Sequence, residues 1–204
     1  MKHRSRVVLA GGIAVALAIV LAPAPLEAHM NSTGLGPSYD GLLHFLLSPE
    51  DVAPVIALAL LGGLRGADYG RRAMFVLPAA WLFGGLIGAA VTSANAHPVI
   101  AAGWFLLLGG LVAADARLSL RATTALAALL GVSHGYLNGV GLGESGTTVQ
   151  ILIGLIFAVF TVVALAAAFV VRLRAPWTRI AVRVVGSWIA ASGLLMLGWA
   201  ARRG

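Results

Sequence analysis

Cysteine is absent from the 204 residues, and charged side chains make up only 10% of them. Without cysteine the chain can form no disulfide, thiolate nucleophile, iron–sulfur cluster or cysteine-ligated zinc site. An ordinary soluble domain carries roughly 25% charged residues, so the low charge argues against a soluble enzyme. Any bound metal must therefore use histidine, carboxylate, asparagine, methionine or backbone donors.

Apolar side chains are abundant instead: 60% of the residues are hydrophobic, and the mean hydropathy is +0.96. A soluble globule of this size could not cover so much apolar surface, so the bilayer is the expected solvent. The net charge of +7 would suggest nucleic-acid binding in a soluble protein. Here the basic residues fall in short gaps between apolar runs, so they indicate membrane topology, and we expect no nucleic-acid partner.

The first 28 residues have the organisation of a secretory signal peptide. Three basic residues precede an apolar run over residues 7–22, which ends in Pro-Ala-Pro-Leu-Glu-Ala. We predict cleavage after Ala28; the alternatives are cleavage after Ala24 and an uncleaved first membrane helix. Cleavage after Ala28 would make His29 the amino-terminal residue, whose amine and imidazole could together chelate a metal such as copper or nickel. Alternatively, His29 only marks where the signal ends.

Six apolar segments follow, most of them close to the roughly 20 residues that a helix needs to cross a bilayer. They are Asp51–Leu64, Arg72–Val91, Pro98–Ala114, Arg121–Val140, Thr147–Val171 and Ile180–Ala200. We therefore expect an all-α membrane protein with one six-helix domain over residues 29–204, in which residues 29–50 form an outer segment that could dip into the membrane. Small-residue spacings such as Gly84-x3-Gly88, Gly109-x3-Ala113 and Gly186-x3-Ala190 predict close helix packing.

Basic residues predict the orientation of these segments. Nine arginines lie in or beside the first, third and fifth gaps, whereas the gaps around residues 94–97 and 141–147 contain no lysine or arginine. The positive-inside rule places the arginine-rich gaps in the cytoplasm, with both termini outside the inner membrane of a bacterium. Arg202 and Arg203 at the carboxyl terminus are the one mild conflict.

The outer segment contains a first candidate pair, Asp40 and His44. If this stretch is helical, the two side chains share one face and could bind one ion together, or the carboxylate could orient the imidazole. The alternative is an amphipathic surface helix with an incidental salt bridge. The following Ser48-Pro49-Glu50-Asp51 is more typical of a helix start, with Ser48 as N-cap and acids in the first turn, than of a ligand set.

The fourth segment contains His134, the only ionisable group well inside a predicted span, about 10 Å below its outer end. Ionisable groups at such depth are usually functional, although a hydrogen bond to a neighbouring helix is the alternative. We predict a metal site in the outer half of the bundle. Its main candidates are His29, Asp40, His44, His134 and Asn138, with Glu50, His97, Tyr136 and Glu144 as accessory candidates.

One string resembles an enzyme motif. Gly131-Val-Ser-His-Gly135 matches the G-x-S-x-G of hydrolases, but that motif requires a strand–turn–helix context. On a helix, Ser133 and His134 point to different sides, and no later segment supplies a histidine, as rhomboid proteases require. Walker, Rossmann and H-E-x-x-H motifs are also missing. We therefore expect no enzymatic activity and no permanently bound cofactor.

Several stretches resemble the second branch of the HupE/UreJ family: Tyr39-Asp40-Gly41-x2-His44, the Ser-Pro-Glu-Asp start, His134-Gly-Tyr-x-Asn-Gly and the closing run from Arg183. The resemblance implies a small six-helix inner-membrane protein that supplies nickel or cobalt, with Asp40, His44 and His134 handling the metal. Better-known members have a second histidine and a glutamate where this chain has Asn138 and Gly141, which leaves copper open. The alternative function is a non-transporting metal-binding membrane protein that acts with metalloenzyme assembly proteins.

Overall fold

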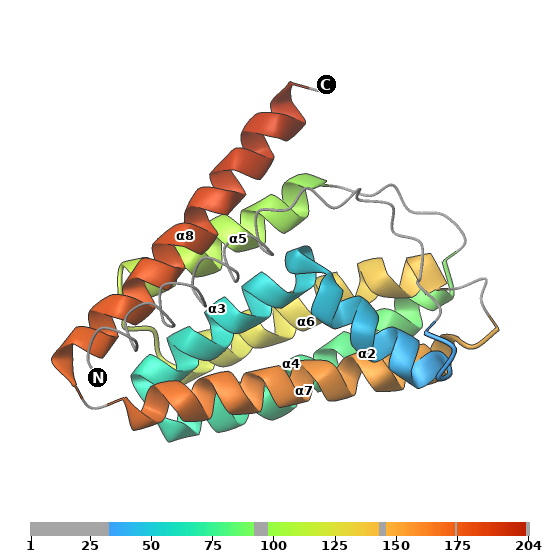
Figure 1. Ribbon diagram of the computed structural model, residues 1–204, viewed down its shortest axis with the longest axis horizontal. Coiled ribbons are helices and arrows are strands. Elements are labelled where there is room, and N and C mark those ends of the chain that lie inside the picture. The colour runs from blue at the N-terminus through green and yellow to red at the C-terminus, as the bar shows by residue number, and fades with distance from the viewer. Residues whose placement is uncertain (1–32, 92–97, 143–145, 174, 203–204) are drawn as a thin grey trace, which may run out of the picture. The chain divides into compact units, whose positions relative to one another are not determined.

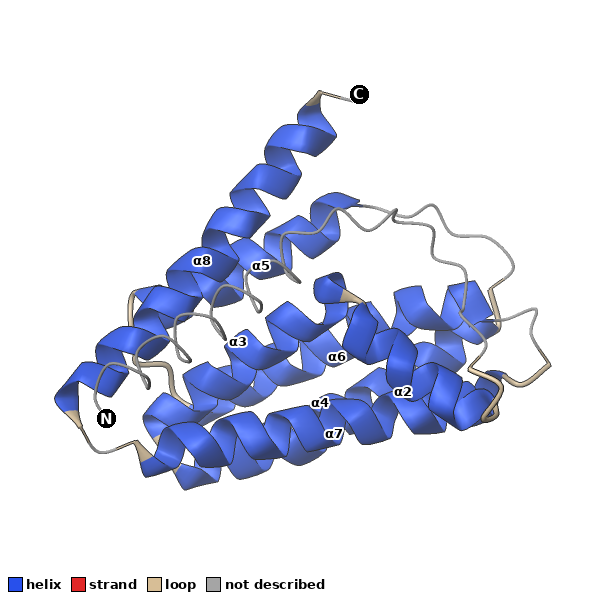
Figure 2. Ribbon diagram, viewed as in Figure 1, coloured by secondary structure: helices blue, strands red, loops and turns tan. Residues whose placement is uncertain are grey.

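The computed structural model describes residues 33–91, 98–142, 146–173 and 175–202. The described residues form helices and no strand (Figure 2), which confirms the all-α prediction. The helices, labelled as in Figure 1, are α2 (Pro37–Leu47), α3 (Pro49–Arg65), α4 (Ala67–Ala89), α5 (Pro98–Ala113), α6 (Leu120–Leu142), α7 (Thr148–Arg172) and α8 (Pro176–Ala201). The predicted signal peptide, His29, His97 and Glu144 lie outside the described residues.

Helices α3 to α8 occupy the positions of the six predicted segments. Three of them, α4, α7 and α8, are long and apolar enough to cross a membrane, and α2 with α3 forms a fourth candidate that is bent by 73°. Helix α3 has 17 residues, about 25 Å of helix, which is less than the roughly 30 Å hydrocarbon core. The membrane class is therefore confirmed, and the count of six complete spans stays a prediction.

The bend between α2 and α3 lies at Ser48. A residue before proline is disfavoured in the α conformation, and Ser48 precedes Pro49 with φ −98° and ψ 94°. Helix α3 begins at Pro49, as predicted. Ser48 is the N-cap residue of α3, as predicted, but its hydroxyl donates to the backbone oxygen of His44 at 2.7 Å and makes no cap hydrogen bond to α3. The hydroxyl thus ties the end of α2 to the start of α3.

Helices α4 and α6 approach each other backbone to backbone through glycines. A Cβ atom on Gly135 would overlap the carbonyl group of Trp81, and one on Gly139 would overlap that of Gly85. Gly84 on α4 lies equally close to the backbone of α6, which confirms the packing role predicted for Gly84-x3-Gly88. This contact holds α6 rigidly against α4.

Helices α5 and α8 form a second close pair, which we call the α5–α8 pair. Gly109 on α5 meets the backbone of Ala190, and Gly186 on α8 meets the side chain of Val112, as the spacings predicted. Helix α3 contacts both α5 and α8 and also α4, α6 and α7, while α2 packs on α7. Helix α3 is therefore the element that joins the α5–α8 pair to the other four described helices.

Candidate metal-binding site

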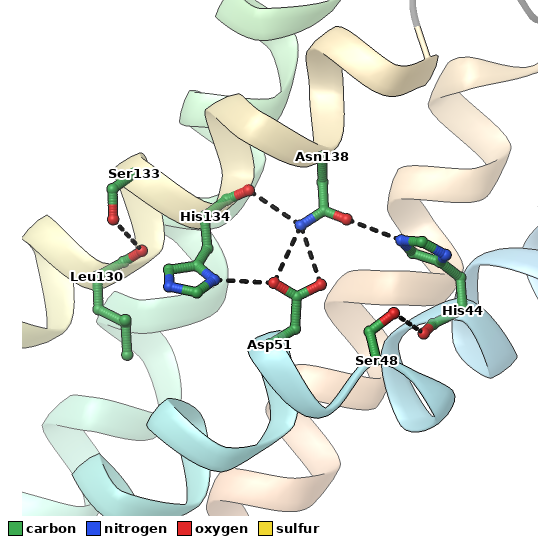
Figure 3. A network of polar contacts seen from close by, with 7 residues as sticks. All are labelled: His44, Ser48, Asp51, Leu130, Ser133, His134 and Asn138. Carbon is green, nitrogen blue, oxygen red and sulfur yellow. Dashed lines mark hydrogen bonds and ion pairs between the residues drawn. The ribbon is translucent and has the colours of Figure 1, made fainter. Parts of the chain in front are cut away.

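A polar network lies where the bent pair α2–α3 faces α6 (Figure 3). His44 comes from the last turn of α2 and Asp51 from the first turn of α3, so the bend at Ser48 brings the two residues to one place. His134 and Asn138 come from α6 and share one face because they are four residues apart. Three helices thus contribute to one cluster.

The Asp51 carboxylate is the centre of this network. Its Oδ1 atom lies 2.8 Å from Nδ1 of His134, and both of its oxygens accept hydrogen bonds from Nδ2 of Asn138, at 3.3 and 3.1 Å. Asp51 is 4% exposed and His134 is 3% exposed. A carboxylate buried to this degree is stable only when it is well hydrogen-bonded, and three hydrogen bonds supply that requirement here.

The carboxylate sets the direction of every other hydrogen bond in the network. An ionised carboxylate only accepts, so Nδ1 of His134 must carry the proton that it shares with Asp51. The amide nitrogen of Asn138 donates to the carboxylate and to the backbone oxygen of His134, at 3.0 Å, so its Oδ1 is left as an acceptor. Nε2 of His44, 3.0 Å from that Oδ1, must then be the donor.

Both imidazoles are consequently held with one ring nitrogen free to bind a ligand. In the neutral ring, protonation of Nδ1 leaves Nε2 of His134 with a lone pair, and protonation of Nε2 leaves Nδ1 of His44 with one. Nε2 of His134 is buried and has no hydrogen-bond partner among the described residues. A carboxylate that orients a histidine in this way is the usual outer partner of a metal-binding imidazole.

Aromatic rings enclose His134 on another side. The Trp81 ring lies 5.4 Å from the His134 ring, tilted by 42°, and Phe45 meets Trp81 edge to face at 5.9 Å. Trp81 and Phe45 are both fully buried. The rings exclude water, which strengthens the charge-assisted hydrogen bonds of Asp51.

The outer side of the network carries further oxygen donors. Glu50 is half-buried and directly precedes Asp51 in the first turn of α3. Pro54, inside α3, has no N–H group and cannot make the helical hydrogen bond to the Glu50 carbonyl. A carboxylate and a carbonyl thus lie within one helical turn of Asp51.

The predicted site residues divide into three groups. His44, His134 and Asn138 are brought together as expected, and Glu50 lies beside them. Asp40 instead accepts a hydrogen bond from the backbone N–H of Thr33 at 2.6 Å. Tyr136 is half-buried on α6 with its backbone against Gly88. His29, His97 and Glu144 lie outside the described residues.

Asp51 is the site residue that the sequence analysis missed. Asp51 lies three residues after Ser48, where acidic residues are common because they stabilise the start of a helix. This local role accounted for the residue, so it was not predicted as part of the site. A different signal was available: Asp51 lies seven residues after His44 and begins a nearly uninterrupted apolar helix. A carboxylate at the end of such a helix needs a partner, and that partner is supplied by α6.

Ser133 lies apart from this chemistry. Its hydroxyl donates to the backbone oxygen of Leu130 at 3.0 Å, whereas the adjacent His134 faces Asp51 (Figure 3). The two side chains therefore point in different directions, as expected for neighbours on a helix. The G-x-S-x-G string thus has neither its strand–turn–helix context nor a serine–histidine contact.

The site differs from a closed metal cage. Within the described part of the chain, no three histidine or carboxylate side chains are arranged to hold one metal ion. The donors that are available are single atoms of His134, His44 and Glu50, together with backbone oxygen. An ion held here would keep water molecules among its ligands, and such a site releases its ion more readily than a complete cage does.

A family model described as HupE / UreJ protein matches residues 17–196, which include α2 to α7 and most of α8. The chain belongs to the HupE/UreJ family. This family is associated with nickel and cobalt transport or with metallocentre assembly. No curated protein and no solved structure gives a significant match to the chain.

Proposed function

We propose that this HupE/UreJ protein is an inner-membrane permease for a divalent transition metal, nickel or cobalt, with its binding site open to the periplasm. The observation that carries the proposal is the Asp51–His134 pair. Its carboxylate fixes the shared proton on Nδ1 of His134, and Nε2 is left buried without a hydrogen-bond partner among the described residues. The metal is the transported substrate, and no resident cofactor is required.

The donor atoms favour a transition metal over magnesium or calcium. Imidazole nitrogen suits nickel, cobalt, copper and zinc, whereas magnesium and calcium prefer sites made entirely of oxygen. A histidine binds metal through a ring nitrogen that carries no proton, and the hydrogen bonds from His134 to Asp51 and from His44 to Asn138 fix which nitrogen that is. The replacement of a family histidine by Asn138 leaves copper as the competing substrate.

The position of the site supports transport. Transporters commonly bind substrate where a membrane helix is interrupted, because helix ends and freed backbone groups can face the ligand there. Here the site lies at the 73° break between α2 and α3. Arg65 lies at the opposite end of α3 and pairs with Asp115, which also pairs with Arg179, so the basic end of the helices is remote from the site. The positive-inside rule places that basic end in the cytoplasm.

The arrangement of the donors also supports transport over tight storage. A transport site must bind strongly enough to select an ion and weakly enough to release it. Figure 3 shows the free ring nitrogens of His134 and His44 on opposite sides of the Asp51–Asn138 pair, so the two imidazoles would bind an ion at successive positions and neither would hold it in a complete cage. Water or backbone oxygen can complete the coordination during passage.

The test is time-resolved nickel uptake into cells that lack other nickel transporters, with cobalt and copper measured in parallel. The samples contain the unmodified chain, His134→Ala and the neighbouring control Ser133→Ala at matched membrane levels. We expect uptake with the unmodified chain and with Ser133→Ala, because that hydroxyl bonds only to its own helix. We expect His134→Ala to reduce uptake to background.

The outcomes separate the two family functions. Absence of uptake of all three ions by correctly inserted protein would refute the permease. Tight metal binding by that same protein, lost in His134→Ala, would instead support the role in metalloenzyme assembly. Equal uptake by His134→Ala and the unmodified chain would show that the transported ion does not bind His134 on α6.

A further inference from the structure

A second polar cluster lies at the other end of α3. Arg65, the last residue of α3, forms an ion pair with Asp115, which follows α5. Arg179 near the start of α8 donates to both Asp115 oxygens, at 2.6 and 2.9 Å. The Arg65 side chain is 9% exposed and that of Asp115 is 18% exposed, so the contact is largely shielded from water.

The backbone fixes the position of the Asp115 carboxylate. Asp115 has a φ of 52°, and the turn is closed by hydrogen bonds from Asp115 N to Val112 O at 3.0 Å and from Ala116 N to Leu111 O at 2.9 Å. These two bonds define a Schellman motif, in which the left-handed position is usually glycine. Aspartate tolerates this conformation better than most residues, and here it also supplies a charge to the helix end.

The contacts of Asp115 with Arg179 and with Arg65 connect different helices. The bond to Arg179 lies within the α5–α8 pair, as does the bond from Arg183 to the backbone oxygen of Ala113 at 2.8 Å. The bond to Arg65 connects that pair to α3 and hence to the helices that carry the metal site. Helix α3 is also the helix through which the α5–α8 pair packs on the others.

One face of α3 links both clusters. Asp51 and Arg65 are 14 residues apart, which corresponds to about 21 Å along the helix and to nearly the same face. Leu58 and Leu61, seven and four residues before Arg65, lie on that face, and both are fully buried. Between the metal site and the arginine end, this face is therefore closed by apolar side chains.

We propose that the Arg65–Asp115 ion pair is the latch of a cytoplasmic gate, which opens when the α5–α8 pair moves away from α3. This inference rests on the proposed transport function and assigns the device that closes the inner half of the route. Breaking the latch frees the arginine end of the interface between α3 and the α5–α8 pair, next to the helix face that carries Leu58 and Leu61. The α4–α6 contact takes no part in this movement, because α5 and α8 pack on the other helices through α3.

The absence of cysteine makes the gate directly measurable, because any introduced thiol is the only one in the chain. Leu61→Cys places a probe on the face of Arg65. Ala59→Cys is the matched control, because Ala59 is also fully buried. Ala59 lies about 120° around the helix from Arg65. It is one turn before Gly62 and Gly63, which face α4 and α7. Inverted membrane vesicles expose the cytoplasmic face to a membrane-impermeant thiol reagent.

Three further substitutions are combined with each probe. Arg65→Gln breaks the connection between α3 and the α5–α8 pair, and Asp115→Asn removes its carboxylate. Arg179→Gln breaks a bond of Asp115 that lies within the pair and leaves the Arg65 contact intact. We expect Arg65→Gln and Asp115→Asn to raise the modification rate of Leu61→Cys about tenfold, while Arg179→Gln changes it less than twofold.

The control probe excludes general loosening: Ala59→Cys should be modified at an unchanged rate in every background. An unchanged Leu61→Cys rate in both Arg65→Gln and Asp115→Asn would overturn the latch. Equal increases at both probes, or an increase with Arg179→Gln as large as that with Arg65→Gln, would also overturn it. Metal uptake by the unmodified chain is measured separately, so a failure of transport is distinguishable from a failure of the gate.

Discussion

Replacement of Asp51 by asparagine tests how the site works, because it keeps the shape of the side chain and removes its charge. In the native site the carboxylate lies 2.8 Å from Nδ1 of His134 and holds the proton on that nitrogen. Loss of such an outer carboxylate typically lowers metal affinity 10–100-fold, which equals about 1.4–2.7 kcal/mol. We therefore expect Asp51→Asn to raise the half-saturating nickel concentration by this factor.

The assay is initial-rate nickel uptake by proteoliposomes over a range of nickel concentrations. Uptake at saturating nickel should fall only slightly, because Nε2 of His134 is still present. Asp68→Asn is the control: this carboxylate pairs with Arg71 three residues away and is 73% exposed, so its removal should leave the uptake curve unchanged. Asp51→Ala is a poorer variant, since it would leave two buried donors without an acceptor, at about 1–3 kcal/mol each.

Two results would refute this reasoning. If Asp51→Asn has the half-saturating concentration of the unmodified chain, the carboxylate does not determine which nitrogen of His134 is free. If it abolishes uptake at every nickel concentration, as His134→Ala is expected to do, Asp51 binds the metal directly. In the second case the ion would replace the hydrogen bond between Asp51 and His134 when it binds.

Three further predictions concern the framework. Gly135→Ala should lower the melting temperature in detergent by several degrees, because its Cβ would collide with the Trp81 carbonyl at a cost of about 1–3 kcal/mol, whereas Gly110→Ala, with open space, should not. Trp81→Ala should cost about 3–5 kcal/mol by the same measurement, and Trp81→Phe much less. Burial opposes ionisation of Asp115, but the hydrogen bond from Arg179 and nearby arginine charges outweigh it and hold its pKa below the usual range. A lowered pKa gives stability that is present above about pH 4 and is lost as the pH falls further, so the melting-temperature difference between the unmodified chain and Asp115→Asn should be constant from pH 7 to 5 and shrink below pH 4.

The sequence by itself determined the class and the helix positions. Scarce charge and long apolar runs exclude a soluble fold, because only a bilayer can accommodate that composition. The apolar runs predicted the positions of α3 to α8 to within a few residues, and Pro49 predicted where α3 begins. Small-residue spacings predicted the close contacts of α4 with α6 and of α5 with α8, since glycine is what permits such an approach.

Part of the site was also readable, because a histidine deep in an apolar helix needs a partner. The spacing of His134 and Asn138 placed both on one face of α6, and His44 was expected beside them. The role of Asp51 was not readable, because near a proline its local pattern equally describes a helix start. Asp40 satisfied the same spacing rule as His134 and Asn138, yet its carboxylate bonds to Thr33.

Only the tertiary structure decided which polar groups meet. The 73° bend turns α2 so that His44 reaches Asn138, and the packing of α3 beside α6 brings Asp51 to His134 across 83 positions of the chain. Likewise, the joining of Arg65 to Asp115 depends on how the α5–α8 pair lies against α3. Helical periodicity is local, whereas these contacts depend on the angles between helices, which packing of side chains over the whole bundle determines.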